Sequence, residues 1–220
     1  MEADLPKVRV NAFSVSIDGF GAAVGQSLEN PFGVGGMAVV NWLTSTKTFH
    51  EHLGTGGKGS AGIDDDVAAA AMQGLGAWIL GRNMFGPVRG PWANLEWKGW
   101  WGPNPPYHTP VFVLTHHARP ELEMQGGTVF HFVTSGIHDA LNRARAAAGD
   151  RDIRIGGGAA VIRQYLQAGL VDEMHLAISP VILGAGESPF TGVNLPALGY
   201  AVAESRFGEN AMHVTLRKGA

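Results

Sequence analysis

The stretch that decides the fold is Ile153-Arg154-Ile155-Gly156-Gly157-Gly158-Ala159-Ala160-Val161-Ile162. Its β-branched start predicts a strand, and the apolar residues from Val161 onward recur at helical spacing. Glycines between a strand and a helix let backbone amides approach a phosphate at the positive end of the helix. A dinucleotide pyrophosphate is the natural ligand of such a turn. The alternative is a tight turn that needs glycine only for its backbone angles.

The segments around this stretch alternate between strand and helix patterns. The strand at 152–155, the helix around 161–166 and the alternating run at 174–178 predict one βαβ unit. Further strands are expected at 7–17, 78–80, 111–115 and 128–134, helices at 39–52, 64–72 and 135–149, and a hairpin at 201–216. We therefore expect an α/β protein with a mostly parallel mixed sheet, helices on both faces and a C-terminal antiparallel hairpin. The length of 220 residues favours a single domain over 1–220.

The amino-acid composition limits the kinds of molecule that this protein is expected to bind. Lys and Arg total 16 against 19 Asp and Glu, without the cation clusters that nucleic acid or a membrane surface requires. The absence of cysteine excludes disulfides, thiolate metal sites and thiol nucleophiles, and it favours the cytoplasm. An acidic start at Met1-Glu2-Ala3-Asp4 is unlike a secretory signal. We expect a small-molecule partner, no nucleic acid and no membrane, and a homodimer is compatible with the sequence.

A second glycine turn, Gly81-Arg82-Asn83-Met84-Phe85-Gly86, follows the strand expected at 78–80. The carboxyl ends of parallel strands gather at one edge of a sheet, so this turn and the 156–158 turn are expected to hold one cofactor together. An arginine fork suits a 2′-phosphate, which favours NADPH over NADH if Arg82 points inward. A solvated surface arginine is the alternative.

Taken in order, Ser14 to Gly19, the 81–85 turn, Thr115-His116-His117 and the run from Gly156 to Gly186 resemble the dihydrofolate-reductase-like superfamily. More narrowly, the chain looks like the reductase (RibD C-terminal) domain of riboflavin biosynthesis and its stand-alone relatives. The resemblance implies a three-layer dihydrofolate-reductase-like fold and an NADPH-dependent reductase. A zinc deaminase module, often fused to such reductases, is absent from the sequence.

The resemblance also implies positions for cofactor and substrate. The cofactor residues that it implies are Gly81, Arg82, Asn83, Thr115, His116, Ser135, Gly156, Gly157, Gly158, Ala159, Ala160, Val161 and Ile162. Gly157 to Ile162 would face the pyrophosphate and nicotinamide, Arg82 and Thr115-His116 the adenosine ribose and its phosphate, and Ser135 the adenine. Riboflavin-pathway reductases usually carry a substrate-binding glutamate where this chain has Gly156.

The proton donor is less clearly indicated. Dihydrofolate reductases place a carboxylate on the helix after the first strand, and the matching region offers Asp64, Asp65 and Asp66. Neighbours on a helix point in different directions, so at most one of them faces a pocket. We expect Asp64 to be the N-cap and Asp66 the partner of the helix dipole, which leaves Asp65 as the catalytic candidate.

Further substrate candidates are Asp18, Trp92 and Glu187, each with a structural alternative. Asp18-Gly19 is first of all a turn signal, and Glu187 follows a glycine-rich strand end. Trp92 lies in a proline-rich segment, 87–110, that holds four of the six tryptophans and forms either an aromatic wall or packed loop. Neither His50/His52 nor His116/His117 has a third metal ligand in a recognisable array, so no metal is expected.

The sequence leaves two alternative functions to be tested. The first is an NADPH-dependent reductase that transfers hydride to a small planar heterocycle such as a pterin or pyrimidine, by analogy with the family. The second is a catalytically silent nucleotide-binding or oligomeric scaffold of the same fold. A serine hydrolase is excluded because no Gly-x-Ser-x-Gly elbow occurs.

Overall fold

The computed structural model describes residues 6–87 and 89–219. Contacts between Cα atoms divide the chain into two compact units. The first contains residues 6–10 and Gly74–Asp172, and the second contains Asn11–Gln73 and the residues from Glu173 onward. Each unit therefore combines two separate stretches of sequence. A single domain stays a prediction.

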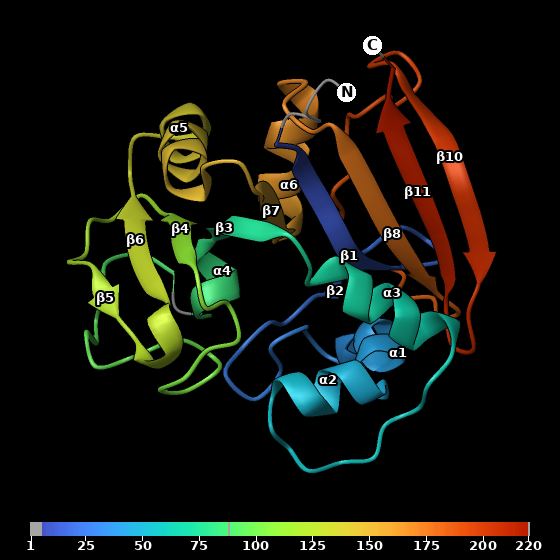
Figure 1. Cartoon of the computed structure of the whole chain (residues 1–220), viewed down its shortest axis with the longest axis horizontal. Coiled ribbons are helices and arrows are strands. Elements are labelled where there is room, and N and C mark those ends of the chain that lie inside the picture. Colours follow the sequence, from blue (N-terminus) through green and yellow to red (C-terminus); the bar gives the residue numbers. More distant parts are fainter. Residues whose placement is uncertain (1–5, 88, 220) are drawn as a thin grey trace. The chain divides into compact units, whose positions relative to one another are not determined.

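The first unit has a mostly parallel sheet, in the order β1-β7-β3-β4-β6-β5 (Figure 1). All neighbouring pairs are parallel except β5 with β6, which is antiparallel. Its strands are β1 (Val8–Ser16), whose first three residues belong to this unit, β3 (Leu75–Gly81), β4 (Pro110–Leu114), β5 (Leu122–Glu123), β6 (Val129–Val133) and β7 (Asp152–Gly157). The expected parallel strands are confirmed.

The helices of the first unit are α4 (Arg82–Phe85), η2 (Gln125–Gly127), α5 (Ile137–Ala148) and α6 (Ala159–Gln167). The longer helix α5 contacts β3 and β4, whereas α6 contacts β7 and β3. Leu141 and Ala144 on α5 and Ile162 and Leu166 on α6 are buried, and their helical spacing places each pair on one face of its helix. The strand residue Ile155 is also fully buried. Burial of these apolar faces holds both helices against the sheet.

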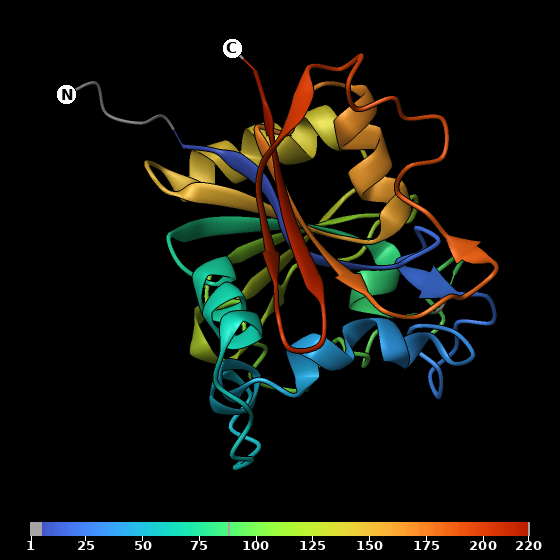
Figure 2. The same ribbon diagram turned by 90° about the vertical axis from the view of Figure 1, so that its right-hand side faces the viewer.

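The second unit contains the long C-terminal hairpin (Figure 2). Its strands follow the order β10-β11-β8-β1, and β11 pairs antiparallel with both neighbours. The elements of this unit are the rest of β1, β2 (Ala22–Ala23), η1 (Gly36–Val40), α1 (Asn41–Thr44), α2 (Lys47–His52), α3 (Ile63–Ala71), β8 (Glu173–Ser179), β9 (Gly186–Glu187), β10 (Tyr200–Phe207) and β11 (Met212–Lys218). The hairpin expected from the Gly208-Glu209-Asn210 turn is confirmed.

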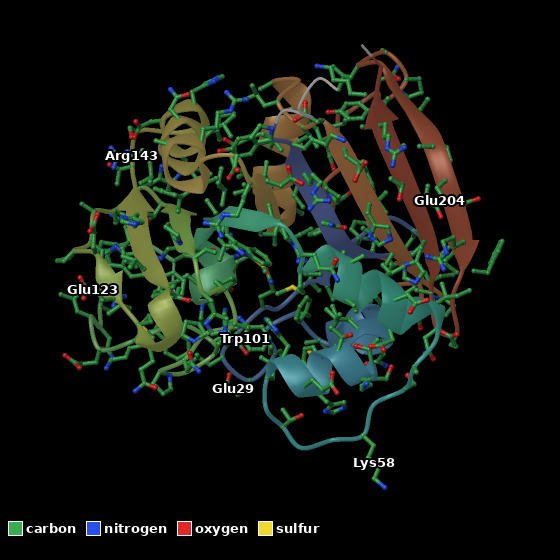
Figure 3. The ribbon with its side chains drawn as sticks, in the orientation of Figure 1. Glu29, Lys58, Trp101, Glu123, Arg143 and Glu204 are labelled. Carbon is green, nitrogen blue, oxygen red and sulfur yellow. The ribbon has the colours of Figure 1, made fainter. Side chains whose placement is uncertain are left out.

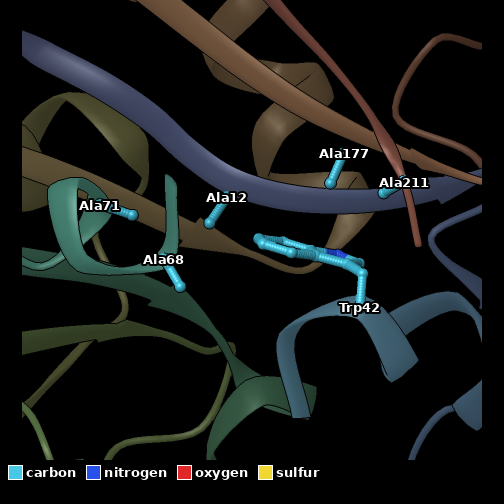
Figure 4. Packing of buried hydrophobic residues seen from close by; sticks show 6 residues of the cluster. All are labelled: Ala12, Trp42, Ala68, Ala71, Ala177 and Ala211. Atoms are coloured by element: carbon cyan, nitrogen blue, oxygen red, sulfur yellow. The ribbon is translucent and has the colours of Figure 1, made fainter. Parts of the chain in front are cut away.

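A tryptophan among alanines forms part of the core of the second unit (Figure 4). Trp42 on α1 is 1% exposed, and the alanines packed with it are Ala12, Ala68, Ala71, Ala177 and Ala211. Its indole Nε1 donates a hydrogen bond of 2.8 Å to Ser14 Oγ on β1. Small side chains on two strands, α3 and the hairpin thus make room for one large ring.

Two expectations about helices are wrong in detail. The single helix expected at 39–52 is divided into η1, α1 and α2, because Thr46 is extended and its hydroxyl accepts the Phe49 N–H as a new N-cap. The N-cap of α3 is Gly62 rather than Asp64. Glu209 in the hairpin turn accepts hydrogen bonds from the Ile63 and Asp64 N–H groups, so Asp64 need not cap its own helix.

Among the residues that the structure describes, no helix has the length and apolar character needed to cross a membrane.

Candidate cofactor site

The two glycine turns lie side by side in the first unit. Gly81 ends β3 and Gly157 ends the neighbouring strand β7, and Leu80 pairs with Gly157 in the sheet. A Cβ added to Gly81 would lie 2.9 Å from Val161 Cγ2 and 3.3 Å from the Gly158 backbone nitrogen. A side chain at position 81 would therefore press against the start of α6. Glycine at this position allows the two turns to approach each other.

The N-terminus of α6 has the local geometry expected of a phosphate-binding turn. Gly158 is its N-cap, with φ −72° and ψ −171°, and within the described residues no side chain caps it. Gly157, which has φ 115°, is joined to Gly158 by a cis peptide bond. A Cβ built on Gly158 would meet nothing within 4 Å. The protein's own packing therefore leaves open space beside amides at the positive end of a nine-residue helix.

Arg82 joins the β3 turn to the end of β4. Its Nη1 donates to Gly90 O at 2.9 Å and to Thr115 Oγ1 at 3.3 Å. Its guanidinium carbon lies 3.3 Å from the centre of the Trp92 ring. Burial, and then the nearby positive charge of Arg119, lowers the pKa of Arg82. Its Nε and Nη2 are buried and have no hydrogen-bond partner within residues 6–87 and 89–219.

Arg119 is a second cation that the sequence analysis did not single out. It is 9% exposed and lies about equally far from three rings, with its guanidinium carbon 5.2 Å from Phe85, 5.0 Å from Trp92 and 5.1 Å from Phe132. Its Nη2 donates hydrogen bonds of 2.7 Å to the carbonyls of Leu95 and Trp97. Arg82 and Arg119 therefore concentrate positive charge around one indole. No sequence motif pointed to Arg119, because its partners lie on three separate segments.

The tryptophan-rich loop packs on its own unit. Indole N–H groups of three tryptophans donate to backbone carbonyls, Trp92 to His117, Trp97 to Phe85 and Trp100 to Asn83. Trp101 is 40% exposed (Figure 3) and donates to Tyr107 Oη. This geometry favours the packed-loop alternative for the first three. One face of Trp92 is covered by Arg82, and a substrate role for Trp92 stays a prediction.

Gly156, the position at which the resemblance implies a glutamate in related reductases, has two side chains close beside it. A Cβ at this position would lie 2.6 Å from Leu80 Cδ2 and 3.2 Å from the Trp78 ring. Arg154, two residues earlier on β7, lies 4.4 Å above the Trp78 ring, and burial lowers its pKa to about 9. A glutamate at 156 would require Leu80 and Trp78 to move.

The other predicted cofactor residues lie at strand or helix ends of the same unit. Thr115 follows β4, is 8% exposed and forms a turn with His117, while His116 is exposed. Ser135 donates to Asp139 in the first turn of α5. Asn83 lies on α4, beside Arg82. Contact of any of them with a cofactor stays a prediction.

The remaining candidates belong to the second unit. Asp18 accepts hydrogen bonds from the Leu183 and Gly184 N–H groups, and a hydrogen bond from Ser16 together with these two lowers its pKa. These contacts favour the turn alternative. Glu187 lies on β9, which pairs with β2. Asp65 accepts the Thr48 N–H at 2.7 Å, and its catalytic role stays a prediction.

Comparison with known families and structures agrees with this fold. The RibD C-terminal domain model matches residues 6–214. A putative riboflavin biosynthesis protein from Shewanella sp. PV-4 superposes with a TM-score of 0.56 at 18% identity, covering 99% of this chain and 100% of that one. A pyrimidine reductase-like protein from Corynebacterium diphtheriae gives a TM-score of 0.52 at 15% identity, covering 98% and 92%.

A curated relative, the uncharacterized protein YyaP of Bacillus subtilis (strain 168), is 39% identical over 76 residues. That match spans 34% of this chain and 39% of the relative. The family match covers nearly all of the chain, so this protein belongs to the RibD C-terminal domain family. The expected α/β fold with a mostly parallel sheet and a C-terminal hairpin is confirmed.

Proposed function

We propose that this protein is an NADPH-dependent reductase that transfers hydride to a small planar heterocycle. The observation that carries the proposal is the contact between the Gly81 turn and the N-terminus of α6, with open space beside Gly158. Backbone amides at a helix N-terminus bind phosphate without a side chain. Two adjacent turns at the carboxyl ends of parallel strands suit a ligand with two phosphates.

The choice of NADPH over NADH rests on Arg82 and Arg119. Both cations are partly withdrawn from solvent, and three of their N–H-bearing atoms have no partner in the described part of the chain. A dianionic 2′-phosphate near these groups would relieve the repulsion between the two guanidinium groups. NADPH, when bound, supplies hydride from its nicotinamide ring. The glycine turn and Val161 would orient the cofactor, and a carboxyl group or water would supply the proton.

The substrate class comes from the family. The pyrimidine reductase-like relative and the riboflavin-pathway relatives favour a pyrimidine or pterin ring. Because Leu80 and Trp78 occupy the space beside Gly156, we propose a substrate that lacks the group which the family's usual glutamate binds. A catalytically silent nucleotide-binding scaffold remains the second candidate, favoured by the missing glutamate.

Two measurements separate these functions. Ligand that binds only the folded state at 100 times its Kd stabilises by about 2.7 kcal/mol. For a chain of this size that corresponds to a rise in Tm of about 5–10 °C. An unchanged Tm at millimolar NADPH, with Gly158→Asp behaving like the parent, contradicts both functions. Binding without oxidation of NADPH by any pterin or pyrimidine in a panel supports the scaffold.

A further inference from the structure

Three buried titratable side chains of the second unit form one continuous chain of hydrogen bonds. His213 Nε2 lies 2.9 Å from Asp64 Oδ1, and His213 Nδ1 lies 3.2 Å from His175 Nε2. His175 Nδ1 in turn accepts the Ala12 N–H at 3.1 Å. Asp64 is 1% exposed, His213 2% and His175 7%. None of these groups has a part in the function proposed above.

The Ala12 N–H, at one end of this hydrogen-bond chain, determines which imidazole nitrogens carry a proton. An amide N–H can only donate, so His175 Nδ1 carries a lone pair and the ring proton of neutral His175 is on Nε2. That proton points at His213 Nδ1, which must then accept, so the His213 proton is on Nε2 and is donated to Asp64. Reversing the direction would leave His175 with no proton on either nitrogen. The geometry therefore assigns the Nε2–H form to both histidines, with the His213 proton donated to Asp64.

The hydrogen-bond chain connects four elements that are distant in sequence. Asp64 is on α3, His213 on β11, His175 on β8 and Ala12 on β1. Ala12 has φ 51°, an uncommon angle for alanine, and its N–H also lies 3.1 Å from Asn11 Oδ1. A bent point in β1 thus directs an amide toward a histidine on a neighbouring strand.

The surroundings leave little room for rearrangement. The His213 and Trp42 rings are nearly perpendicular, with 5.0 Å between ring centres, and Trp42 packs with the alanine cluster of Figure 4. The other Asp64 oxygen accepts hydrogen bonds from Asn210 N and Nδ2, at 2.9 and 3.0 Å. Asp64 faces His213, and Glu209 from the hairpin turn, which is exposed and caps α3, also interacts with the charge of His213.

We propose that the His213–His175 contact is an acid-sensitive joint between β11 and strands β8 and β1. A second proton on His213 would lie on Nδ1 and face the Nε2–H of His175. A second proton on His175 would lie on Nδ1 and face the Ala12 N–H. Asp64 attracts a proton to His213, but it cannot remove this opposition between two donors. Acidification therefore breaks the hydrogen bond between His213 and His175, whereas the Asp64–His213 and Asp64–Asn210 hydrogen bonds persist.

The sign of the pH effect follows from proton binding. An unfolded histidine takes up a proton near pH 6.5, while the folded joint has no place for one. The unfolded state then binds more protons, so stability is lost as the pH falls through this range. Between pH 7.5 and pH 5 each histidine can raise the unfolding equilibrium constant by at most about 30-fold, and by less once acid has opened the joint in the folded state.

The first test determines directly which imidazole nitrogens of His175 and His213 carry a proton. Long-range ¹H–¹⁵N NMR of the imidazole nitrogens at pH 7.5 should show His175 and His213 as neutral Nε2–H forms. Amide hydrogen exchange between pH 7.5 and 5, corrected for intrinsic rates, should show protection lost at Ala12 before Asn210. An Nδ1–H form of either ring, a doubly protonated ring at pH 7.5, or equal loss at both amides overturns the proposal.

The second test uses His213→Gln, whose amide nitrogen can donate to Asp64 and whose oxygen can accept from His175 without titrating. From pH 7.5 to pH 5 the unfolding constant measured with denaturant should rise less in this variant than in the parent, by a factor of up to about 30. The control is His138→Gln on the exposed side of α5, which should follow the parent. Identical pH dependence of parent and His213→Gln overturns the proposal, and if that variant does not fold, the NMR and exchange measurements on the parent decide.

Discussion

Replacing Gly158 by alanine separates stability from cofactor binding at the α6 turn. Gly158 has φ −72°, an ordinary angle for any residue, and its added Cβ would meet nothing within 4 Å of the protein. The folded chain should accept the methyl group without a clash. If NADPH phosphates lie against this backbone, the methyl group occupies their place. Stability should therefore be kept while affinity for NADPH is lost.

The magnitudes for Gly158→Ala follow from these contacts. A glycine replaced at a compatible angle stabilises by about 0.4–1 kcal/mol, because the unfolded chain loses freedom, which raises Tm by about 1–4 °C. Losing a charge-assisted hydrogen bond from the backbone costs about 1.5–3 kcal/mol of binding, or roughly 10–150-fold in Kd. Calorimetric unfolding measures the first quantity, and titration calorimetry with NADPH measures the second.

The control for Gly158→Ala is the same change at Gly219, where the added Cβ meets only Gly199 O at 3.7 Å. Gly219→Ala should bind NADPH like the parent. Gly158→Ala with parental affinity would refute the placement of phosphate at this turn. A large fall in Tm would refute the reasoning about open space.

Three further predictions concern charged side chains. Arg82→Ala should weaken NADPH more than NADH, by about 1.5–3 kcal/mol, since only NADPH has a 2′-phosphate, and equal losses in titrations with both cofactors would contradict this. Asp65→Asn can still accept the Thr48 N–H, so it should lower turnover in steady-state assays with little change in Tm or NADPH affinity, whereas parental turnover removes Asp65 as the proton donor. The Glu209→Gln variant should lose less stability than the parent as the pH falls from 7 to 3. Hydrogen bonds from the Asp64 and Ile63 N–H groups lower the pKa of Glu209, so its stabilisation is present above its usual value of 4.5 and is lost as the pH falls below it. Urea unfolding from pH 7 to 3 measures this, and parallel curves for parent and variant would contradict it.

The order of strands and helices in the first unit was predictable because its signals are local. Alternation in β7, helical spacing in α6 and glycines between them depend only on neighbours in the chain, and the structure has both elements there. The contact of Gly81 with the α6 turn was also predictable, because carboxyl ends of adjacent parallel strands must meet at one edge. The two-residue strands β2, β5 and β9 gave no signal, since so few residues show no period.

The site residues were harder to assign, because their roles depend on partners far away in sequence. Asp64 was expected at the N-cap, but Glu209 caps α3 from 145 residues away and Asp64 is buried against His213. Arg119 went unnoticed because the rings and carbonyls around it come from separate loops. Three consecutive aspartates in a sequence do not reveal which of their carboxylates faces the core.

By itself, the sequence determined the α/β class and the glycine turns, because backbone angles and hydrophobic periodicity are properties of short segments, and the family followed from the resemblance of its motifs. Only the tertiary structure decided that Leu80 and Trp78 fill the space beside Gly156, and that Asp64 meets His213. Which side chains lie in contact, and which hydrogen bonds they form, depends on contacts between distant segments that no local pattern encodes.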